Sequence, residues 1–274
     1  MADNSPLLFR YPGGKHYAMN ILRPFWEAVS HAEYREPFVG GGSVFFNKPK
    51  VANNWLNDLD SELITTYRVI SQPNQRQELI DLLNEEVASP DRWCEVRAMT
   101  PTSDLLVAFK YFYLNRTSFS GKLVSAAWGY REKRSLPPHR WQERINPCGN
   151  RLNDVRFTSV DFTEVIETPS SNWTLLYVDP PYYLPPKHKH YRHGFDESDH
   201  DRLSRALKAT PHRFFLTYDD APAIRKKYKW ANIFPVKFFY RVDNSSVLGG
   251  SRRLGFELVI TNYDLPSQTL FEEI

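Results

Sequence analysis

The chain has 274 residues, of which 41% are apolar and 15% aromatic, enough material for one large core with an insertion. No apolar run approaches the roughly 20 residues that span a bilayer, and the polar first six residues lack the segments of a signal peptide. We therefore expect a cytoplasmic protein without a membrane partner. Cys94 and Cys148 have no C-x-x-C spacing and no nearby histidine cluster, which predicts free thiols rather than a zinc site or a disulfide framework.

Positive charge is concentrated in two segments, although the net charge is only +3. Residues 110–156 contain ten Lys or Arg against three Asp or Glu, and residues 222–253 contain eight against one. Contacts to phosphate need Lys and Arg in quantity, so this distribution favours a face that binds a polyanion. Scattered, solvated charge is the alternative.

Strand-like and helical runs alternate in the first quarter of the chain and again after about residue 155, which is typical of a parallel sheet with helices on its faces. "EYREPFVGGGSVFF" predicts a strand ending at Pro37, a turn at residues 40–42 and a helix start. The next strand is expected at residues 51–56. A helix should follow it, with one face formed by Leu59, Leu63, Tyr67 and Ile70.

The alternation stops between residues 75 and 150, which predicts a helical insertion into one domain formed by residues 1–74 and 151–274. Strands are then expected in "VRFTSVDF", "TLLYVDPP" and "HRFFLTYDD". The run "SDHDRLSRALKA" predicts a helix capped by Ser198 or Asp199. The segments "FFYRVDNSSVLGG" and "GFELVITNY" predict a terminal antiparallel pair.

Two motifs are expected at the carboxyl ends of strands, where ligands bind in such sheets: "PFVGGG" and "DPPYY". Gly40 and Gly42 would let the backbone approach a ligand. Asp58, at the end of the next strand, could accept hydrogen bonds from ribose hydroxyls or cap the following helix. In "FRYPGGK", Lys15 could pair with a small carboxylate, although such a heptapeptide is also compatible with an ordinary turn.

Taken in order, these segments resemble the DNA adenine methyltransferase family, whose signature is D-P-P-Y. "RYPGGK" is similar to the family's first cofactor motif, "EPFVGGGSVF" to its glycine loop and "LNDLDSELI" to its ribose-binding acid. "YLNRTSFSG" matches the start of its target-recognition insertion, and "VDPPYY" its catalytic motif. The resemblance implies a Rossmann-like, mostly parallel α/β methyltransferase sheet with a C-terminal antiparallel hairpin. It also implies a bacterial or phage-infected cell as the source.

The resemblance implies a catalytic role for residues 179–182. An exocyclic amine is a poor nucleophile, and Asp179 with the carbonyl of Pro180 would accept its hydrogens. Pro180 and Pro181 would fix the backbone so that both acceptors are preorganised. Tyr182 would stack on the base, which must first be flipped out of the duplex.

The implied methyl donor is S-adenosylmethionine, whose activated methyl requires positioning rather than a metal. By the same resemblance, the residues around this cofactor would be Tyr11, Gly13, Lys15, Glu36, Pro37, Phe38, Gly40, Gly42, Asp58, Asp161, Phe162 and Asp179. Phe162 could equally be an ordinary core residue.

The implied partner is double-stranded DNA, bound by a protein that we expect to be a monomer in solution. Asn115, Arg116 and Lys122 lie in the segment that corresponds to the family's recognition insertion, but "SAAWGYREKRSLPPHRW" departs from the expected pattern after "FSG". Lys187 and Lys189, in "PPKHKHYRHGF", are expected to contact DNA. The three histidines of that segment could suggest a metal, but without carboxylates at a suitable spacing we expect none.

Two other functions compete with adenine methylation. Transfer to the cytosine N4 amine would use the same acceptor geometry, although Asp rather than Ser at position 179 favours adenine. A catalytically silent DNA-binding relative is the other alternative, and the intact D-P-P-Y motif argues against it.

Overall fold

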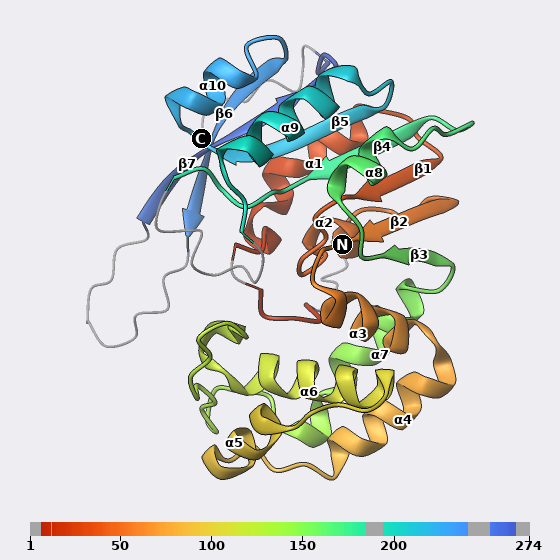
Figure 1. Ribbon diagram of the computed structural model, residues 1–274, viewed down its shortest axis with the longest axis vertical. Coiled ribbons are helices and arrows are strands. Elements are labelled where there is room, and N and C mark those ends of the chain that lie inside the picture. The colour runs from red at the N-terminus through yellow and green to blue at the C-terminus, as the bar shows by residue number, and fades with distance from the viewer. Residues whose placement is uncertain (1–6, 12, 185–193, 241–252, 267–274) are drawn as a thin grey trace.

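The computed structural model describes residues 7–11, 13–184, 194–240 and 253–266. Figure 1 shows a twisted sheet flanked by helices, with a group of further helices, α4 to α7, beyond one end. The strands are β1 (Glu33–Glu36), β2 (Asn53–Asn57), β3 (Val155–Thr158), β4 (Thr174–Val178), β5 (Arg213–Asp219), β6 (Asn232–Tyr240) and β7 (Arg253–Thr261). The helices are α1 (Met19–Glu27), α2 (Ser43–Asn47), α3 (Ser61–Ser71), α4 (Pro73–Asn84), α5 (Pro90–Ala98), α6 (Asp104–Thr117), α7 (Gln142–Arg151), α8 (Phe162–Glu167), α9 (Glu197–Ala209) and α10 (Pro222–Lys227), with short 3-10 turns at His16–Ala18, Phe119–Gly121 and Pro138–Arg140.

The strands form one seven-stranded sheet in the order β3-β2-β1-β4-β5-β7-β6. The first five strands in this order are parallel to one another, whereas β7 runs antiparallel to both β5 and β6. Chain order reverses between β1 and β4, which lie side by side although more than 130 residues separate them. The predicted fold class, a mostly parallel sheet with a C-terminal antiparallel pair, is confirmed.

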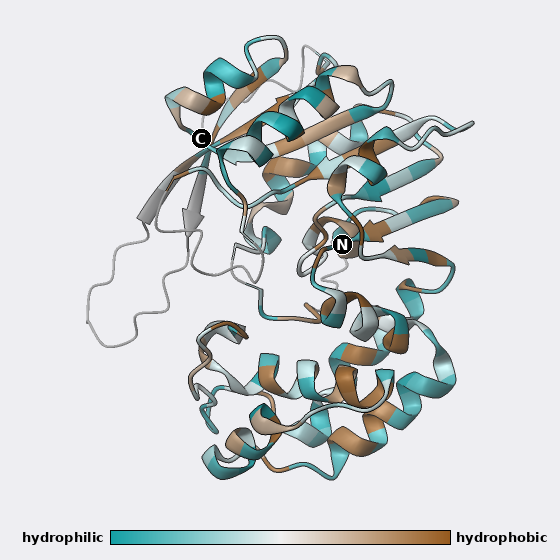
Figure 2. Ribbon diagram, in the orientation of Figure 1, coloured by the Kyte–Doolittle hydropathy of each residue, from teal (hydrophilic) through white to brown (hydrophobic). Residues whose placement is uncertain are grey.

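Both faces of the sheet are buried, which explains the unbroken apolar run of β4. Leu175 and Tyr177 belong to the core that includes side chains of α1, α2 and α3, whereas Leu176 and Val178 belong to the core formed with α8, α9 and α10. This alternation is the two-residue period of a strand. In Figure 2, β5 is mostly hydrophobic, whereas β1 is mostly hydrophilic, and the helices carry both hydrophilic and hydrophobic residues.

Helices α4 to α7 occupy the chain between α3 and β3, and α6 and α7 pack against α3. Their apolar side chains, including Leu83, Phe112 and Trp141, are continuous with the core on one face of the sheet. Residues 111–118, on α6 and just beyond it, are all buried, as expected for a helix surrounded by protein on every side. The boundaries of the insertion as a separate domain remain a prediction.

Three local predictions are corrected. Leu59 is 43% exposed because α3 begins only at Ser61, after the N-cap Asp60, whereas Leu63 is fully buried as expected. The N-cap of α9 is Asp196, which forms a capping box with Asp199. Strand β6 begins at Asn232, earlier than the segment from which it was predicted.

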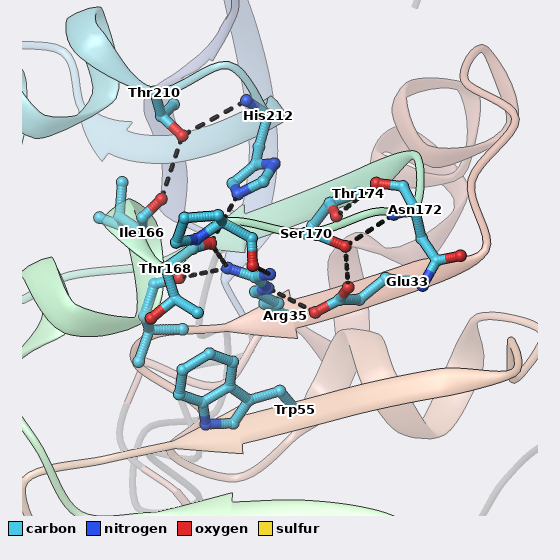
Figure 3. A network of polar contacts seen from close by, with 12 residues as sticks. Glu33, Arg35, Trp55, Ile166, Thr168, Ser170, Asn172, Thr174, Thr210 and His212 are labelled. Atoms are coloured by element: carbon cyan, nitrogen blue, oxygen red, sulfur yellow. Dashed lines mark hydrogen bonds and ion pairs between the residues drawn. The ribbon is translucent and has the colours of Figure 1, made fainter.

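A buried arginine fixes α8 to the sheet. The Arg35 side chain is 1% exposed, and its guanidinium donates to Val165 O at 2.8 Å, to Thr168 O at 2.6 Å and to Glu33 Oε1 at 2.7 Å (Figure 3). These carbonyls lie at the end of α8, where helix carbonyls lack partners within the helix. Arg35 thereby holds the helix whose first residue, Phe162, lies at the cavity described below.

Candidate active site

The two sequence motifs emerge next to each other at one edge of the sheet. Strand β1 ends at Glu36 and β4 ends at Val178, and the two strands are parallel neighbours. The glycine loop that follows β1 and the D-P-P-Y segment that follows β4 therefore leave the sheet on the same side. The predicted position of both motifs at the carboxyl ends of strands is confirmed, and the structure shows that the two strands are neighbours.

A cavity lies at this edge. Eight residues predicted for the cofactor line it, namely Tyr11, Gly13, Pro37, Phe38, Gly40, Asp58, Phe162 and Asp179. Four others do not line it: Lys15, Glu36, Gly42 and Asp161. Part of the wall comes from the insertion, through Asn115 and residues 121–124. The cavity is thus shared between the sheet and the helical segment.

The glycine loop is shaped by Tyr11. Gly40 and Gly42 have φ values of +46° and +65°, which favour glycine. A Cβ atom on Gly40 would lie 2.8 Å from Tyr11 Cε1, and one on Gly41 would lie 2.8 Å from Tyr11 Cβ. The absence of side chains at these positions lets the ring of Tyr11 pack directly against the loop, which places that ring in the cavity wall.

Asp58 supports the same loop. Its Oδ2 accepts from Gly40 N at 2.9 Å, and its Oδ1 accepts from Asp60 N at 3.0 Å. The alternative role of Asp58 as the cap of α3 is wrong, since the N-cap is Asp60, whose carboxylate accepts from Leu63 N. Asp58 also lines the cavity.

Glu36 lies behind the loop rather than in the cavity wall. It is 1% exposed, and its Oε1 accepts from Tyr34 Oη at 2.6 Å and from Phe45 N at 2.8 Å. Its Oε2 has no hydrogen-bond partner within the described residues. Burial is the main cause that raises the pKa of Glu36 to about 8. In this structure Glu36 connects β1 to the start of α2, which holds both ends of the glycine loop.

Asp161 and Phe162 have different surroundings. Asp161 is the N-cap of α8, accepting from Thr163 N at 3.0 Å, and it also accepts from Arg202 Nη2 at 2.8 Å. The ring of Phe162 is stacked on Phe38 with centroids 5.3 Å apart. Phe162 is therefore both a core residue and part of the cavity wall.

Asp179, the acid of the D-P-P-Y motif, is held by two neighbours. Lys15 Nζ lies 2.9 Å from its Oδ1 and 3.0 Å from its Oδ2, and Thr217 Oγ1 donates to Oδ1 at 2.6 Å. The Lys15 side chain is 3% exposed and that of Asp179 is 19% exposed. The predicted catalytic acid is thus oriented by a cation from the N-terminal motif and a hydroxyl from β5.

The ring of Tyr182 lies beneath the same lysine, 4.7 Å from Lys15 Nζ to the ring centroid. Tyr182 is 5% exposed, and its hydroxyl donates to Glu257 Oε2 at 2.6 Å. Burial, followed by the negative charges of Glu257 and Asp179, raises the pKa of Tyr182 well above its usual range, so the phenol keeps its proton. Of its neighbours in the motif, Pro181 lines the cavity and Pro180 is buried.

Sequence reasoning assigned no role to Thr217, Asp219 and Glu257. Asp219 is 3% exposed and accepts from the backbone N–H groups of Tyr183 at 2.9 Å and Leu184 at 2.7 Å. The segments "FFLTYDD" and "FELVITNY" resemble the family, which is the only signal the sequence offers for these residues. Their individual contacts depend on the pairing of distant strands.

The residues predicted to bind DNA are placed differently from one another. Asn115 is 1% exposed, and its amide donates to Arg10 O and Gly121 O and accepts from Arg10 N. Arg116 is 7% exposed, and burial, with the charges of Arg10 and Arg144, lowers its pKa to about 9. Both side chains are thus buried in the second half of α6, and neither is presented at the surface in this structure.

Lys122 is only partly buried and lines the cavity, and Arg131, Lys133 and Arg134 are exposed. Lys187 and Lys189 lie outside the described residues. Within the part of the chain that the structure describes, no helix is long and apolar enough to cross a membrane. No group of three His, Cys, Asp or Glu suited to a metal ion occurs among those residues either, and the His188–His193 region is outside them.

The sheet order and the D-P-P-Y loop bordering a strand-end cavity define a methyltransferase. A family model described as D12 class N6 adenine-specific DNA methyltransferase matches residues 11–242. The chain belongs to this family. Adenine N6, rather than cytosine N4, is therefore the methylated amine.

Two known proteins illustrate the similarity. The chain is 26% identical over 266 residues to the Type II methyltransferase M.CviBI of Paramecium bursaria Chlorella virus NC1A, covering 93% of this chain and 99% of that protein. It is 25% identical over 242 residues to the DNA N-6-adenine-methyltransferase of Escherichia phage P1, covering 81% of this chain and 31% of that protein.

Proposed function

We propose that the chain binds S-adenosylmethionine in the strand-end cavity and methylates N6 of an adenine flipped out of duplex DNA. The observation that carries this proposal is the position of Asp179. Held by Lys15 and Thr217, it borders the cavity that is also lined by the residues predicted to bind the cofactor. An acceptor for the amine and a place for a methyl donor are therefore adjacent.

The cavity wall suits the parts of the cofactor. Asp58 lines the cavity with a carboxylate that would accept hydrogen bonds from ribose hydroxyls, and the aromatic pair Phe38 and Phe162 offers an apolar surface for a purine ring. Lys15 would serve the cofactor's carboxylate. When bound, S-adenosylmethionine supplies a methyl group that its sulfonium already activates, so the protein's task is positioning.

Asp179 would accept a hydrogen of the adenine amine and so localise the nitrogen lone pair. Thr217 orients the carboxylate before the base arrives, which lowers the reorganisation needed during the reaction. The Lys15 ammonium already bonds Asp179 and lies over Tyr182, the two contacts proposed for the base. Entry of the base must therefore move this ammonium, and the cofactor's carboxylate provides another anion for it.

DNA contact by the insertion is proposed for Lys122 and for the exposed basic residues of segment 131–134. These cations project from the part of the molecule that also closes one wall of the cavity. Phosphate contacts of this kind position a duplex without reading its sequence.

The test is to identify the product. Duplex DNA is incubated with the protein and methyl-labelled S-adenosylmethionine, digested to nucleosides and analysed by mass. We expect N6-methyladenine, formed only with both components present. Label on cytosine, or no labelled nucleoside, would contradict the proposed function.

A further inference from the structure

A buried acid on β7 holds the tyrosine of the D-P-P-Y motif. Glu257 is 1% exposed, and its Oε2 accepts the Tyr182 hydroxyl at 2.6 Å. Glu257 and Tyr182 are 75 residues apart in the chain, on different sides of β5 in the sheet order. The hydroxyl is the only polar group of the Tyr182 side chain, so this bond fixes the position of the outer end of the ring.

A second acid holds the backbone that follows. Asp219 on β5 lies opposite Glu257 in the β5–β7 register, and it accepts from the N–H groups of Tyr183 and Leu184. Asp219 and Glu257, on two antiparallel strands, thus hold residues 182–184 in place. Glu257 bonds the side chain of Tyr182, and Asp219 bonds the backbone of Tyr183 and Leu184. Asp179, at the other end of the segment, is held by Lys15 and Thr217.

Stacking on a base requires only an aromatic ring, and phenylalanine would provide it. A buried carboxylate is costly unless donors satisfy it, and such groups contribute little to stability on balance. Pairing Glu257 with the Tyr182 phenol is therefore not explained by stacking or by stability alone. The bond adds a fixed orientation of the Tyr182 ring.

We propose that Glu257 is a positioning residue for methyl transfer: through the Tyr182 hydroxyl it sets the ring plane on which the flipped adenine stacks. The inference rests on the proposed function, because it concerns how the amine of the stacked base reaches Asp179. Glu257 itself does not touch the reacting atoms in this account. Its effect should appear in the placement of the base rather than in the affinity for DNA or cofactor.

The experiment compares Glu257→Leu, Glu257→Gln and Tyr182→Phe with the wild type. Single-turnover transfer is measured alongside the fluorescence of 2-aminopurine placed at the target adenine. Loss of a buried hydrogen bond predicts about a tenfold lower transfer rate and altered fluorescence for Glu257→Leu and Tyr182→Phe. Glu257→Gln keeps an acceptor oxygen, so its rate should stay within about threefold of the wild type.

The double variant Tyr182→Phe/Glu257→Leu should be no slower than the slower single variant, because both changes remove the same bond between the Tyr182 hydroxyl and Glu257. The matched control is Tyr228→Phe, since the buried Tyr228 hydroxyl has no hydrogen-bond partner within the described residues. Its rate should equal that of the wild type. If Glu257→Leu does not fold, Tyr182→Phe and Glu257→Gln carry the same comparison.

Wild-type rate and fluorescence in Tyr182→Phe, or additive losses in the double variant, would overturn the inference while leaving the proposed function standing. A wild-type protein that transfers no methyl to adenine would instead overturn the proposed function, and with it this inference. Cofactor and DNA dissociation constants, measured for each variant, should change by less than about threefold. A large change in either constant with unaltered fluorescence would also contradict a positioning role.

Discussion

Lys15 and Asp179 form a buried ion pair between the N-terminal motif and the catalytic motif, with Nζ 2.9 Å from Oδ1 and 3.0 Å from Oδ2. The two residues are 164 positions apart in the chain. The pair joins a residue proposed for the cofactor to the residue proposed for the base. Under the proposed function, both substrates of the reaction would depend on one ammonium group.

Lys15→Met should impair cofactor binding and transfer together. Without the ammonium, we expect the cofactor dissociation constant to rise about tenfold, as for loss of a charge-assisted hydrogen bond. Calorimetry with S-adenosylhomocysteine measures it. Lys48→Met is the matched control, because Lys48 is also 3% exposed and lies over a tyrosine ring, 4.6 Å from the Tyr34 centroid. Equal losses in both variants would show that removal of any buried lysine suffices.

Gly40→Ala should displace the Tyr11 ring from the cavity wall. The new Cβ would lie 2.8 Å from Tyr11 Cε1, and φ of +46° adds backbone strain of about 1–2 kcal/mol. We expect weaker cofactor binding and a lower melting temperature. Combining it with Tyr11→Ala should recover part of the lost stability but none of the affinity. Unchanged cofactor affinity in Gly40→Ala would argue against Tyr11 as a cofactor contact.

Stability should depend on pH through Glu36. Burial raises its pKa from 4.5 to about 8 in the folded protein, so the folded state binds its proton more tightly than the unfolded state. This contribution is complete below about pH 4.5 and is lost as the pH rises through about 8. The free energy of unfolding should therefore fall between pH 5 and 8, by at most about 1.4 kcal/mol per pH unit from this group.

Urea denaturation of wild type and Glu36→Gln across that range isolates the effect. Gln keeps the size of the side chain and an acceptor for Phe45 N, but it cannot ionise. The difference in unfolding free energy between the two proteins should change steadily with pH. Parallel pH profiles would mean that Glu36 does not titrate in this way.

Segment 131–134 should contribute non-specific DNA affinity. Lys133→Ala should weaken binding to every sequence alike and reduce the slope of log K against log salt by about one. Arg205→Ala, at an exposed position on α9, serves as the control. Arg116→Met should leave the salt slope unchanged, because Arg116 is buried. A reduced slope for Arg116→Met but not for Lys133→Ala would reverse these assignments.

The sequence predicted the position of the motifs correctly where they directly follow a recognisable strand pattern. The apolar run before Asp179 and the glycine turn after β1 both mark strand ends, so their shared edge followed from the parallel arrangement. Asn115 and Arg116 show the opposite case. Their place in the segment that resembles the family's recognition insertion suggested DNA contact, but both side chains are buried, and this burial depends on tertiary packing.

Contacts between distant strands could not be predicted, because they too depend on tertiary packing. Thr217 and Glu257 look like ordinary strand residues until β5 and β7 are placed beside the D-P-P-Y loop. The N-cap of α9 could have been found, since Asp196 and Asp199 have the spacing of a capping box. The assignment of Asp58 needed the structure, because only the backbone of α3 shows that Asp60 is the cap.

The most direct test of the account is single-turnover methyl transfer by Asp179→Asn, at saturating DNA and S-adenosylmethionine. Asn retains the shape of the side chain but is a weaker acceptor for the amine and loses the charge that pairs with Lys15. We predict a cofactor dissociation constant within about tenfold of the wild-type value and a transfer rate lower by at least about a hundredfold. A folded Asp179→Asn protein that keeps more than about a tenth of the wild-type rate would contradict the role of Asp179 as the acceptor.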